Sequence, residues 1–268
     1  MTQPSPQTSK VAVVTGGARG IGLAAAQWFL DHGWRVALWD IDATTLAATD
    51  QALALPERVL ALHCDVSQPE QVARAAATTQ ERFGRIDALV NNAGVAVFKP
   101  IGETSFTEWQ TVLATNLNGP FLCTQALAPL MLQHGGGAVV NIASISGLRA
   151  STLRVAYGTS KAALIHLTKQ QATELGTVGI RVNAIAPGPV ETEMAKLVHS
   201  VAIRKDYHDV IPLERYGSCQ EMANVIGFLC SPEASYVNGQ VLAVDGGFDA
   251  AGVGLPTLRL RAAEQSGR

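Results

Sequence analysis

The sequence predicts a single-domain α/β protein built on a doubly wound, seven-stranded parallel sheet with helices on both faces. Short β-branched runs alternate with longer segments of helical periodicity along the 268 residues. Glycines and prolines separate these segments, and no composition break, long linker or internal repeat divides them. Such alternation is typical of parallel strands that are joined by crossover helices.

The seven expected strands are short and mainly apolar, as suits strands that are buried on both faces of a sheet. They span residues 10–15, 34–39, 58–63, 86–91, 138–143, 180–185 and 240–244. Helices are expected between them over 21–32, 43–53, 69–83, 106–133, 155–175 and 220–229. Asp42 precedes the second helix as a capping residue, and Pro120 and Pro129 predict kinks in the long fourth one.

Three segments fall outside this alternation. Residues 1–9 are polar and are expected to form a flexible N-terminus before a catalytic domain that spans 10–248. Residues 191–216 are charged and interrupted by Pro212, and we expect them to form a lid over the substrate. Residues 249–268 follow the last strand as a tail that could be disordered, pack on another subunit or help to close a site.

Composition argues against several classes of function. The chain is 47% hydrophobic and 16% charged, with a net charge of −2, which is typical of a globular enzyme and argues against nucleic acid or an acidic membrane as a partner. No apolar run approaches the ~20 residues that cross a bilayer, and the polar N-terminus is not expected to be a signal peptide. Scattered cysteines lead us to expect no metal and a reducing, cytoplasmic location. They are Cys64, Cys123, Cys219 and Cys230.

A glycine-rich turn follows the first strand, with the sequence TGGARGIG over residues 15–22. Glycines let the backbone approach a pyrophosphate closely, and the helix that follows points its N-terminal amides and positive dipole at that charge. Gly20, Gly22 and Ala25 fit a G-x-G-x-x-A spacing, which after a first strand predicts a Rossmann-type dinucleotide site. The alternative is a turn whose glycines serve packing alone.

Asp40 ends the second strand, twenty residues after Gly20 (40 − 20). A carboxylate there can accept both hydroxyls of an adenine ribose, and it would repel the 2′-phosphate of NADP by up to ~4 kcal/mol at ~4 Å. Arg19 acts in the opposite sense, because its side chain can reach a 2′-phosphate. Asp40 occupies the ribose position itself, so we predict NAD rather than NADP. Asp65, after the third strand, is a candidate for the adenine edge and equally for a turn or helix cap.

The sequence YGTSK, residues 157–161, carries the most chemistry. Tyr157 and Lys161 are four residues apart and share a helix face with apolar side chains, where a cofactor would explain the lysine. The common alternative is a lysine that extends along the surface to solvent. Free tyrosine has a pKa of ~10, which a nearby ammonium lowers. Tyr157 would then exchange a proton with a substrate oxygen, an effect worth roughly 10²–10⁴ in rate.

Ser144 follows the fifth strand, thirteen residues before Tyr157 (157 − 144). Its hydroxyl can orient and polarise a substrate oxygen, and Ser146 has a weaker claim to that role. Neither serine sits in a nucleophile elbow, so hydrolysis is not predicted. Without Tyr157 downstream, both would be interpreted as serines of a polar loop.

Together these segments resemble the short-chain dehydrogenase/reductase family. The resemblance covers residues 10–247 and rests on seven motifs in order with matching gaps. They are TGGARGIG (15–22), NNAG (91–94), Asn116 in TNLNG, Ser144, YGTSK (157–161), PGPVET (187–192) and DGG (245–247). The resemblance implies an oxidoreductase that moves a hydride between a nicotinamide nucleotide and an alcohol or ketone.

The resemblance also implies roles that the spacing does not show. Asn116 would hold a water that relays protons from Lys161, Lys161 would bind the nicotinamide ribose, Val190 and Thr192 would anchor the carboxamide, and Asp87 would brace the sheet. The helices that carry Asn116 and Tyr157 would form part of a homotetramer. The expected catalytic residues are Asn116, Ser144, Tyr157 and Lys161, and the expected cofactor-binding residues are Gly16, Arg19, Gly20, Ile21, Gly22, Asp40, Asp65, Val66, Asn92, Ala93, Gly94, Tyr157, Lys161, Pro187, Gly188, Val190 and Thr192.

The substrate site is less well specified. Its expected contacts are Ser144, Ser146, Arg154 and Tyr157, with Val95, Val97 and the lid as further walls. Arg154 is interpreted as a solvated residue, the alternative being a contact with an acidic or polyhydroxylated substrate. His199 and His208 are interpreted as surface residues of the lid.

We therefore predict an NAD-dependent dehydrogenase of an alcohol, polyol or sugar. A 3-oxoacyl or carbonyl reductase that uses NADP(H) is the alternative within the same chemistry, and Asp40 argues against it. A non-catalytic nucleotide-binding protein on the same fold would not need Tyr157 and Lys161. A methyltransferase also places an acid after its second strand, but TGGARGIG and YGTSK count against it.

Overall fold

A seven-stranded sheet, parallel throughout, forms the centre of the protein. The computed structural model describes residues 9–252 and 255–258, and the strand order is β3-β2-β1-β4-β5-β6-β7. The strands are β1 (Val11–Thr15), β2 (Arg35–Asp40), β3 (Val59–His63), β4 (Ala88–Asn91), β5 (Gly137–Ile142), β6 (Ile180–Pro187) and β7 (Val241–Val244). The predicted doubly wound sheet is confirmed. Its order reverses between β1 and β4, where sheets of this kind bind ligands at the carboxyl ends of their strands.

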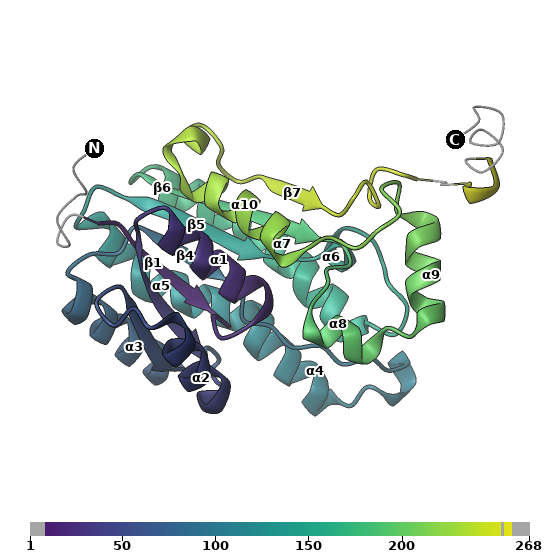
Figure 1. Ribbon diagram of the computed structural model, residues 1–268, viewed down its shortest axis with the longest axis horizontal. Coiled ribbons are helices and arrows are strands. Elements are labelled where there is room, and N and C mark those ends of the chain that lie inside the picture. Colours follow the sequence, from purple (N-terminus) through teal and green to yellow (C-terminus); the bar gives the residue numbers. More distant parts are fainter. Residues whose placement is uncertain (1–8, 253–254, 259–268) are drawn as a thin grey trace.

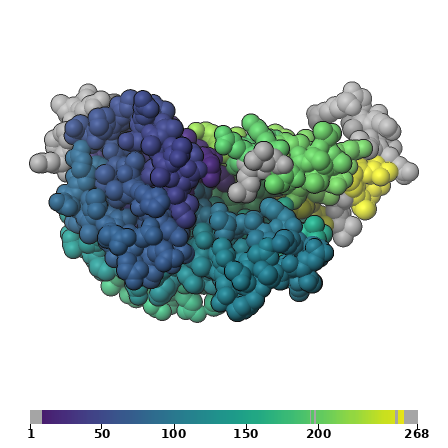
Figure 2. Space-filling model, turned by 90° about the horizontal axis from the view of Figure 1, so that it is seen from below, coloured from purple at the N-terminus to yellow at the C-terminus, as the bar shows by residue number. Residues whose placement is uncertain are grey.

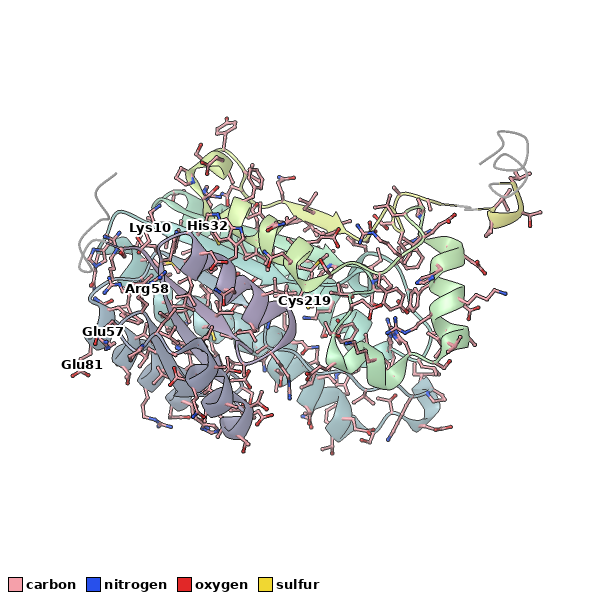
Figure 3. The ribbon with its side chains drawn as sticks, viewed as in Figure 1. Lys10, His32, Glu57, Arg58, Glu81 and Cys219 are labelled. Carbon is pink, nitrogen blue, oxygen red and sulfur yellow. The ribbon has the colours of Figure 1, made fainter. Side chains whose placement is uncertain are left out.

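Helices cover both faces of the sheet (Figure 1). On one face lie α1 (Gly20–Asp31), α2 (Ala43–Leu53) and α10 (Cys219–Cys230), with α1 and α10 side by side. On the other lie α3 (Pro69–Phe83), α5 (Gly119–Leu132) and α7 (Val155–Gly176). The short helices α6 (Ile145–Leu148), α8 (Glu193–Val198) and α9 (Val201–Val210) follow the carboxyl ends of β5 and β6. Lys10 and His32 lie toward the opposite end of the molecule from α9 (Figure 3).

Alternating side chains of each strand build two separate cores. In β1, Ala12 and Val14 pack under α1 and α10, whereas Val11 and Val13 pack against α3 and α5. A shift of one residue in strand register would exchange the two sets. Packing against the helices on both faces of the sheet therefore favours one strand register.

A buried polar junction joins the two middle strands to the helices behind them. Asn91 of β4 pairs in register with Asn141 of β5 and donates to its Oδ1 at 2.8 Å. The Asn141 amide donates in turn to Thr168 Oγ1 at 2.9 Å and Gln171 Oε1 at 3.3 Å on α7, and Asn91 donates to Thr124 Oγ1 on α5 at 3.3 Å. These bonds set the positions of the carboxyl ends of β4 and β5 relative to α5 and α7.

Most predicted helices agree closely with the observed ones. The bounds of α2 and α3 are those expected, and Asp42 caps α2 by accepting from the Thr45 amide at 3.0 Å. Asp87 accepts from the Val11 amide at 2.9 Å and pairs with Arg85, in keeping with a bracing role.

The long helix expected over 106–133 is confirmed in extent, because helical backbone runs without a gap from α4 (Phe106–Leu113) through a π-helical turn (Ala114–Asn118) into α5. Pro120 stands in the first turn of α5, where its missing amide hydrogen costs nothing, and Pro129 lies inside α5. The π turn was not expected, and its wider winding places Asn116 in the interior.

Several remaining features were outside the prediction. Helices α6, α8 and α9 and the 3₁₀ turns Ile101–Glu103 and Pro232–Ala234 were not expected. The flexible N-terminus lies almost wholly outside the described residues, as does much of the tail after residue 252. Within the described part, no helix combines the length and apolarity that a membrane span requires, and no group of three or more His, Cys, Asp or Glu residues is placed to hold a metal.

The polar junction leads to a prediction about stability. Replacing Asn141 by Leu removes a buried donor and acceptor while keeping the branched shape of the side chain, and it leaves the amides and hydroxyls around it without these partners. We expect the free energy of unfolding to fall by about 2–4 kcal/mol, measured by urea denaturation. Asn224 is exposed on α10, so Asn224→Leu should change it by less than about 0.5 kcal/mol. Equal effects of the two substitutions would contradict the role assigned to the junction.

Candidate active site

A cavity of about 650 Å³ opens at the carboxyl edge of the sheet, beyond the ends of β1 and β4, where the strand order reverses. It extends beneath α8 and α9, and the space-filling view shows the molecule hollowed between the purple-to-blue first half of the chain and the green segment that holds these helices (Figure 2). Its wall includes nearly every residue that the sequence predicted for cofactor binding. From that set Gly16, Arg19, Gly20, Ile21, Asp40, Asp65, Val66, Asn92, Ala93, Gly94, Tyr157, Lys161, Pro187, Gly188, Val190 and Thr192 line it.

The glycine-rich turn is shaped by a clamp from β4. The side-chain amide of Asn92, just after β4, donates to the carbonyl oxygens of Thr15 at 3.0 Å and Gly16 at 2.9 Å. Gly16 has a φ of +61°, and a Cβ there would lie 2.9 Å from the Ala93 Cα, so only glycine fits. Gly22 differs from the expectation: it does not line the cavity, and a Cβ on it would meet the Gly16 carbonyl at 2.1 Å. Its role is to pack α1 under the turn.

The start of α1 is suited to bind phosphate. No side chain caps this helix, so amides of its first turn have no side-chain partner. They face the cavity at Gly20 and Ile21, where the helix dipole favours negative charge. A Cβ on Gly20 would meet only the Thr192 methyl group, at 3.8 Å, so open space lies beside the start of the helix, and the residues present fit a dinucleotide.

Asp40 is buried at the cavity wall, and its carboxylate is held by the turn. It accepts from the Ala18 and Asp42 amides, each at 3.0 Å. Arg19, in contrast, is 58% exposed and pairs with Asp42 at 3.2 Å. Asp65 lines the cavity and also accepts from the Ser67 amide at 2.9 Å, so it is a turn residue that faces the adenine end.

The far end of the cavity is closed by the segment after β6. A Cβ on Gly188 would lie 2.8 Å from the Asp245 Cα, which shows how closely this segment approaches the DGG turn. Thr192 lines the cavity and caps α8 by accepting from the Ala195 amide at 3.1 Å. The capping bond holds Thr192 at the cavity wall, and the resemblance implies that Thr192 would contact the nicotinamide carboxamide there.

Ser144, Tyr157 and Lys161 converge at the centre of the cavity. Ser144 caps α6 directly after β5, its Oγ accepting from the Ser146 amide at 3.1 Å, and its hydroxyl also hydrogen-bonds Tyr157. Lys161 is buried, and its Nζ donates to the Ile142 carbonyl at 2.7 Å. The Nζ lies 5.7 Å from the centre of the Tyr157 ring. The lysine is thus not a surface residue, and all three groups face one space.

Burial dominates the ionisation of this group. It raises the pKa of Tyr157, and the bond from Ser144 and the positive charge of Arg154 offset part of that rise. It lowers the pKa of Lys161 from its usual 10.5 to about 8. The expected lowering of the Tyr157 pKa by Lys161 is therefore wrong: the net pKa shift is upward, and the cation that opposes it is Arg154.

Asn116 lies behind the cavity wall. The π turn buries its side chain, which accepts from the Val95 amide at 2.9 Å and donates to the Val95 carbonyl at 2.9 Å and to Ser160 Oγ at 3.0 Å. A Cβ on Gly94 would lie 3.4 Å from Asn116 Oδ1 and 3.5 Å from Lys161 Nζ. Asn116 thus shapes the loop beside Lys161, and its expected role in a proton relay stays a prediction.

The substrate end differs more from the expectation. Ser146 is buried and absent from the cavity wall, its hydroxyl being taken by Ser151 at 2.9 Å and Arg154 at 3.3 Å, so a direct substrate contact is wrong. Arg154 is half-buried at the cavity wall, so the solvated interpretation is also wrong. His199 is half-buried and lines the cavity, contrary to a surface position, whereas His208 is exposed as expected.

Phe98 and Tyr207 complete this end of the cavity. Phe98 was not predicted, and Val97, which was, does not line the wall. Extended chain after β4 gives no sequence signal of which side chains face inward. Tyr207 belongs to α9 and packs against His199 and Phe248, whose ring centres lie 5.3 and 6.1 Å away. These contacts hold α9 against the cavity.

Comparison with known proteins agrees with this geometry. Residues 16–249 match the family model described as "Enoyl-(Acyl carrier protein) reductase", and the chain is 40% identical over 248 residues to 2-(R)-hydroxypropyl-CoM dehydrogenase of Xanthobacter autotrophicus, with 90% of this chain and 99% of the relative covered. The chain belongs to the short-chain dehydrogenase/reductase family.

Other short-chain dehydrogenase/reductase members show the range of chemistry. NAD-dependent glycerol dehydrogenase of Listeria innocua is 37% identical, with 90% of this chain and 94% of the relative covered. The crystal structure of levodione reductase superposes with a TM-score of 0.85 at 37% identity, covering 90% of this chain and 98% of that one. The protein is accordingly an NAD(P)-dependent oxidoreductase that acts on CH–OH groups, rather than a non-catalytic binding protein or a methyltransferase.

The catalytic assignment can be tested with a matched pair of tyrosines. Tyr157→Phe removes the proton donor and acceptor and should lower kcat by roughly 10²–10⁴ in a folded protein, as judged by circular dichroism. Tyr236 is fully exposed, and Tyr236→Phe should leave kcat unchanged. Retention of turnover by Tyr157→Phe would contradict the assignment.

The buried lysine predicts a pH dependence. Below its pKa of about 8 Lys161 is charged, and above it the ammonium that would bind the cofactor ribose loses its charge. The Tyr157 pKa is raised, so Tyr157 keeps its proton through this range. For ketone reduction we expect kcat/KM for the cofactor, which reports groups of the free enzyme, to be level near neutrality and to fall above about pH 8. A profile that stays level across the range where Lys161 titrates would contradict this.

Proposed function

We propose that the protein is an NAD-dependent dehydrogenase that interconverts a small secondary alcohol, such as a polyol, a sugar or a similar alcohol, with its ketone. The observation that carries the cofactor choice is the buried carboxylate of Asp40 at the adenine-ribose end of the cavity. Two backbone amides hold this carboxylate in place by hydrogen bonds. The carboxylate therefore cannot rotate away from a 2′-phosphate without losing both bonds. Arg19 is held by Asp42 and is largely in solvent, where its pull on a phosphate is screened.

The residues at the centre suit acid–base chemistry on an alcohol. A bound nicotinamide supplies the hydride acceptor or donor. Ser144 holds the substrate oxygen by a hydrogen bond, and Tyr157 takes the hydroxyl proton in the oxidative direction or returns it in the reductive one. Lys161 binds the ribose and keeps a positive charge near the phenol oxygen. Each role rests on the convergence of these side chains in one cavity.

A 3-oxoacyl or carbonyl reductase that uses NADP(H) is the second candidate. Its support is the 38% identity, over 97% of the relative, to 3-oxoacyl-(acyl-carrier-protein) reductase of Thermotoga maritima. The glycerol dehydrogenase relative supports the first candidate in turn, because its name specifies both NAD and a polyol. The position of Asp40 supports NAD and therefore favours the first candidate.

We also propose a homotetramer located in the cytoplasm. Phe106 on α4 is 72% exposed and Phe121 on α5 is 47% exposed, which supports burial of these helices against other subunits. The cysteines are free, and three of them are buried, as suits a reducing compartment. Size-exclusion chromatography with light scattering tests the assembly.

The cofactor proposal predicts a charge-dependent preference. The wild type should bind NAD⁺ at least about tenfold more tightly than NADP⁺, a difference of ~1.4 kcal/mol, in fluorescence titrations. Asp40→Asn should raise the affinity for NADP⁺, because it removes the repelling charge. Asp65→Asn removes a charge at the same end of the cavity and should leave the ratio unchanged. Tighter binding of NADP⁺ by the wild type would instead favour the second candidate.

The substrate class is tested by turnover of a panel of polyols, sugars and secondary alcohols with NAD⁺. Turnover that Tyr157→Phe abolishes would support the proposal. The absence of NAD⁺-dependent turnover, together with reduction of 3-oxoacyl thioesters by NADPH, would overturn it.

A further inference from the structure

We propose that the substrate of this cavity carries an anionic group, a carboxylate or a sulfonate, and that Arg154 binds it. This proposal deepens the proposed function, since it assumes that the cavity takes an alcohol or ketone, and it names the feature by which that substrate is selected. It rests on the position of Arg154, on what its guanidinium contacts, and on what it lacks.

The backbone holds Arg154 at the cavity wall near Tyr157. Arg154 is the N-cap residue of α7 and stands three positions before Tyr157, and residues so spaced on a helix have Cβ atoms about 5–6 Å apart. Its backbone pairs with Lys99 in a β-bridge, and Leu153 before it has a φ of +61°. A non-glycine residue in that region costs energy and persists only where its surroundings hold it. The backbone of Arg154 is therefore held on both sides, by the strained residue before it and by the bridge to Lys99.

The contacts of the guanidinium are all neutral. It donates to Ser146 Oγ and to the Tyr207 hydroxyl, each at 3.3 Å, and it lies 5.1 Å from the centre of the Phe98 ring. Both hydrogen bonds are long, so an incoming anion could replace them at little cost. The Phe98 ring attracts the cation without neutralising it, so the N–H groups of the guanidinium stay available to a ligand.

The guanidinium also lacks a counter-ion. None of the ion pairs in the described part of the chain includes Arg154. Arg204, the other arginine of this region, is paired with Glu191 through both of its terminal nitrogens. Glu193 lines the cavity but is exposed and makes no ion pair with Arg154. Two long hydrogen bonds and an aromatic ring replace only part of the hydration that a half-buried cation loses, and no carboxylate balances its charge.

The charge of Arg154 reaches the reacting group. It lowers the pKa of Tyr157 and contributes, after burial, to the lowered pKa of His199. His199 is therefore neutral near pH 7, which makes Arg154 the cation at the substrate end of this wall among the described residues. Arg154 and Tyr157 line the same cavity three residues apart on α7, so one small substrate can contact both. The substrate class that fits is a short hydroxy or oxo acid, or the matching sulfonate.

A binding experiment tests the proposal without requiring turnover. Butyrate, propanesulfonate and the neutral butyramide are titrated into the enzyme with saturating NAD⁺, by calorimetry, for the wild type, Arg154→Gln and Arg154→Lys. Both anions should bind the wild type roughly 10- to 100-fold more tightly than butyramide, as expected for a charge-assisted pair. Arg154→Gln should abolish the difference and Arg154→Lys should retain part of it. The tighter anion identifies the head group.

A matched control removes one positive charge from the same region. Arg149→Gln changes an arginine that bonds the Phe248 carbonyl at 2.8 Å and approaches Asp249 at 4.0 Å, so it should leave the preference for anions unchanged. Unchanged affinity for NAD⁺ in each variant shows that the fold is intact. Equal binding of butyrate and butyramide by the wild type, or an anion preference that survives in Arg154→Gln, overturns the proposal.

Turnover separates this proposal from the proposed function. With NAD⁺, 3-hydroxybutyrate should exceed its methyl ester in kcat/KM by the same factor, and Arg154→Gln should lose the advantage for the acid alone. Turnover of glycerol or the ester at least as fast as the acid would refute the anion and keep the dehydrogenase. Anion binding lost in Arg154→Gln, with no NAD⁺-dependent turnover of any alcohol, would refute the dehydrogenase and keep the anion site.

Discussion

The hydrogen bonds between Asn91, Asn141 and the helices behind them hold the site in place. In a parallel sheet the carboxyl ends of the strands carry the chemistry, but nothing in the strand ladders fixes those ends relative to the helices. The junction does so with buried side chains, which are strong because water cannot compete for them. Asn92 follows Asn91 and clamps the glycine-rich turn. Ser144 follows β5, and Thr168 belongs to the helix of Tyr157. Cofactor turn and catalytic group are thus fixed to one point.

The cavity that results has opposite charges at its two ends. Asp40 and Asp65 stand at the adenine end, and Arg154 stands beyond the catalytic tyrosine. Between them the start of α1 offers amides to phosphate. This charge pattern would align a dinucleotide in one direction, with its adenine-ribose hydroxyls toward Asp40. Its nicotinamide would then lie toward Arg154, where the proposed anionic substrate would bind.

Sequence reasoning succeeded where the signal is local. Asp42 is predicted as a cap because its spacing to the next helix suffices, and the bounds of α2 and α3 follow from periodicity and from Pro69 at a helix start. It failed where contacts distant in sequence decide. The π turn at Asn116 and the burial of Arg154 and His199 depend on packing that no local pattern encodes. Hence nearly every residue predicted for the cofactor lines the cavity, whereas the residues predicted for the substrate line it only in part.

The upward shift in the Tyr157 pKa has a consequence for direction. Burial makes the phenol hold its proton, and Arg154 is the charge that works against burial. An anion bound to Arg154 neutralises that charge, so the pKa of Tyr157 rises further when an anionic substrate enters. A tyrosine that keeps its proton donates it in ketone reduction, and the same side chain must lose a proton before it can accept one from an alcohol. An anion on Arg154 therefore moves the pH range in which Tyr157 serves each direction toward higher pH, while the equilibrium between alcohol and ketone is unchanged. On this argument, the charge of the substrate that Arg154 admits adjusts the pH at which the same three side chains work in each direction.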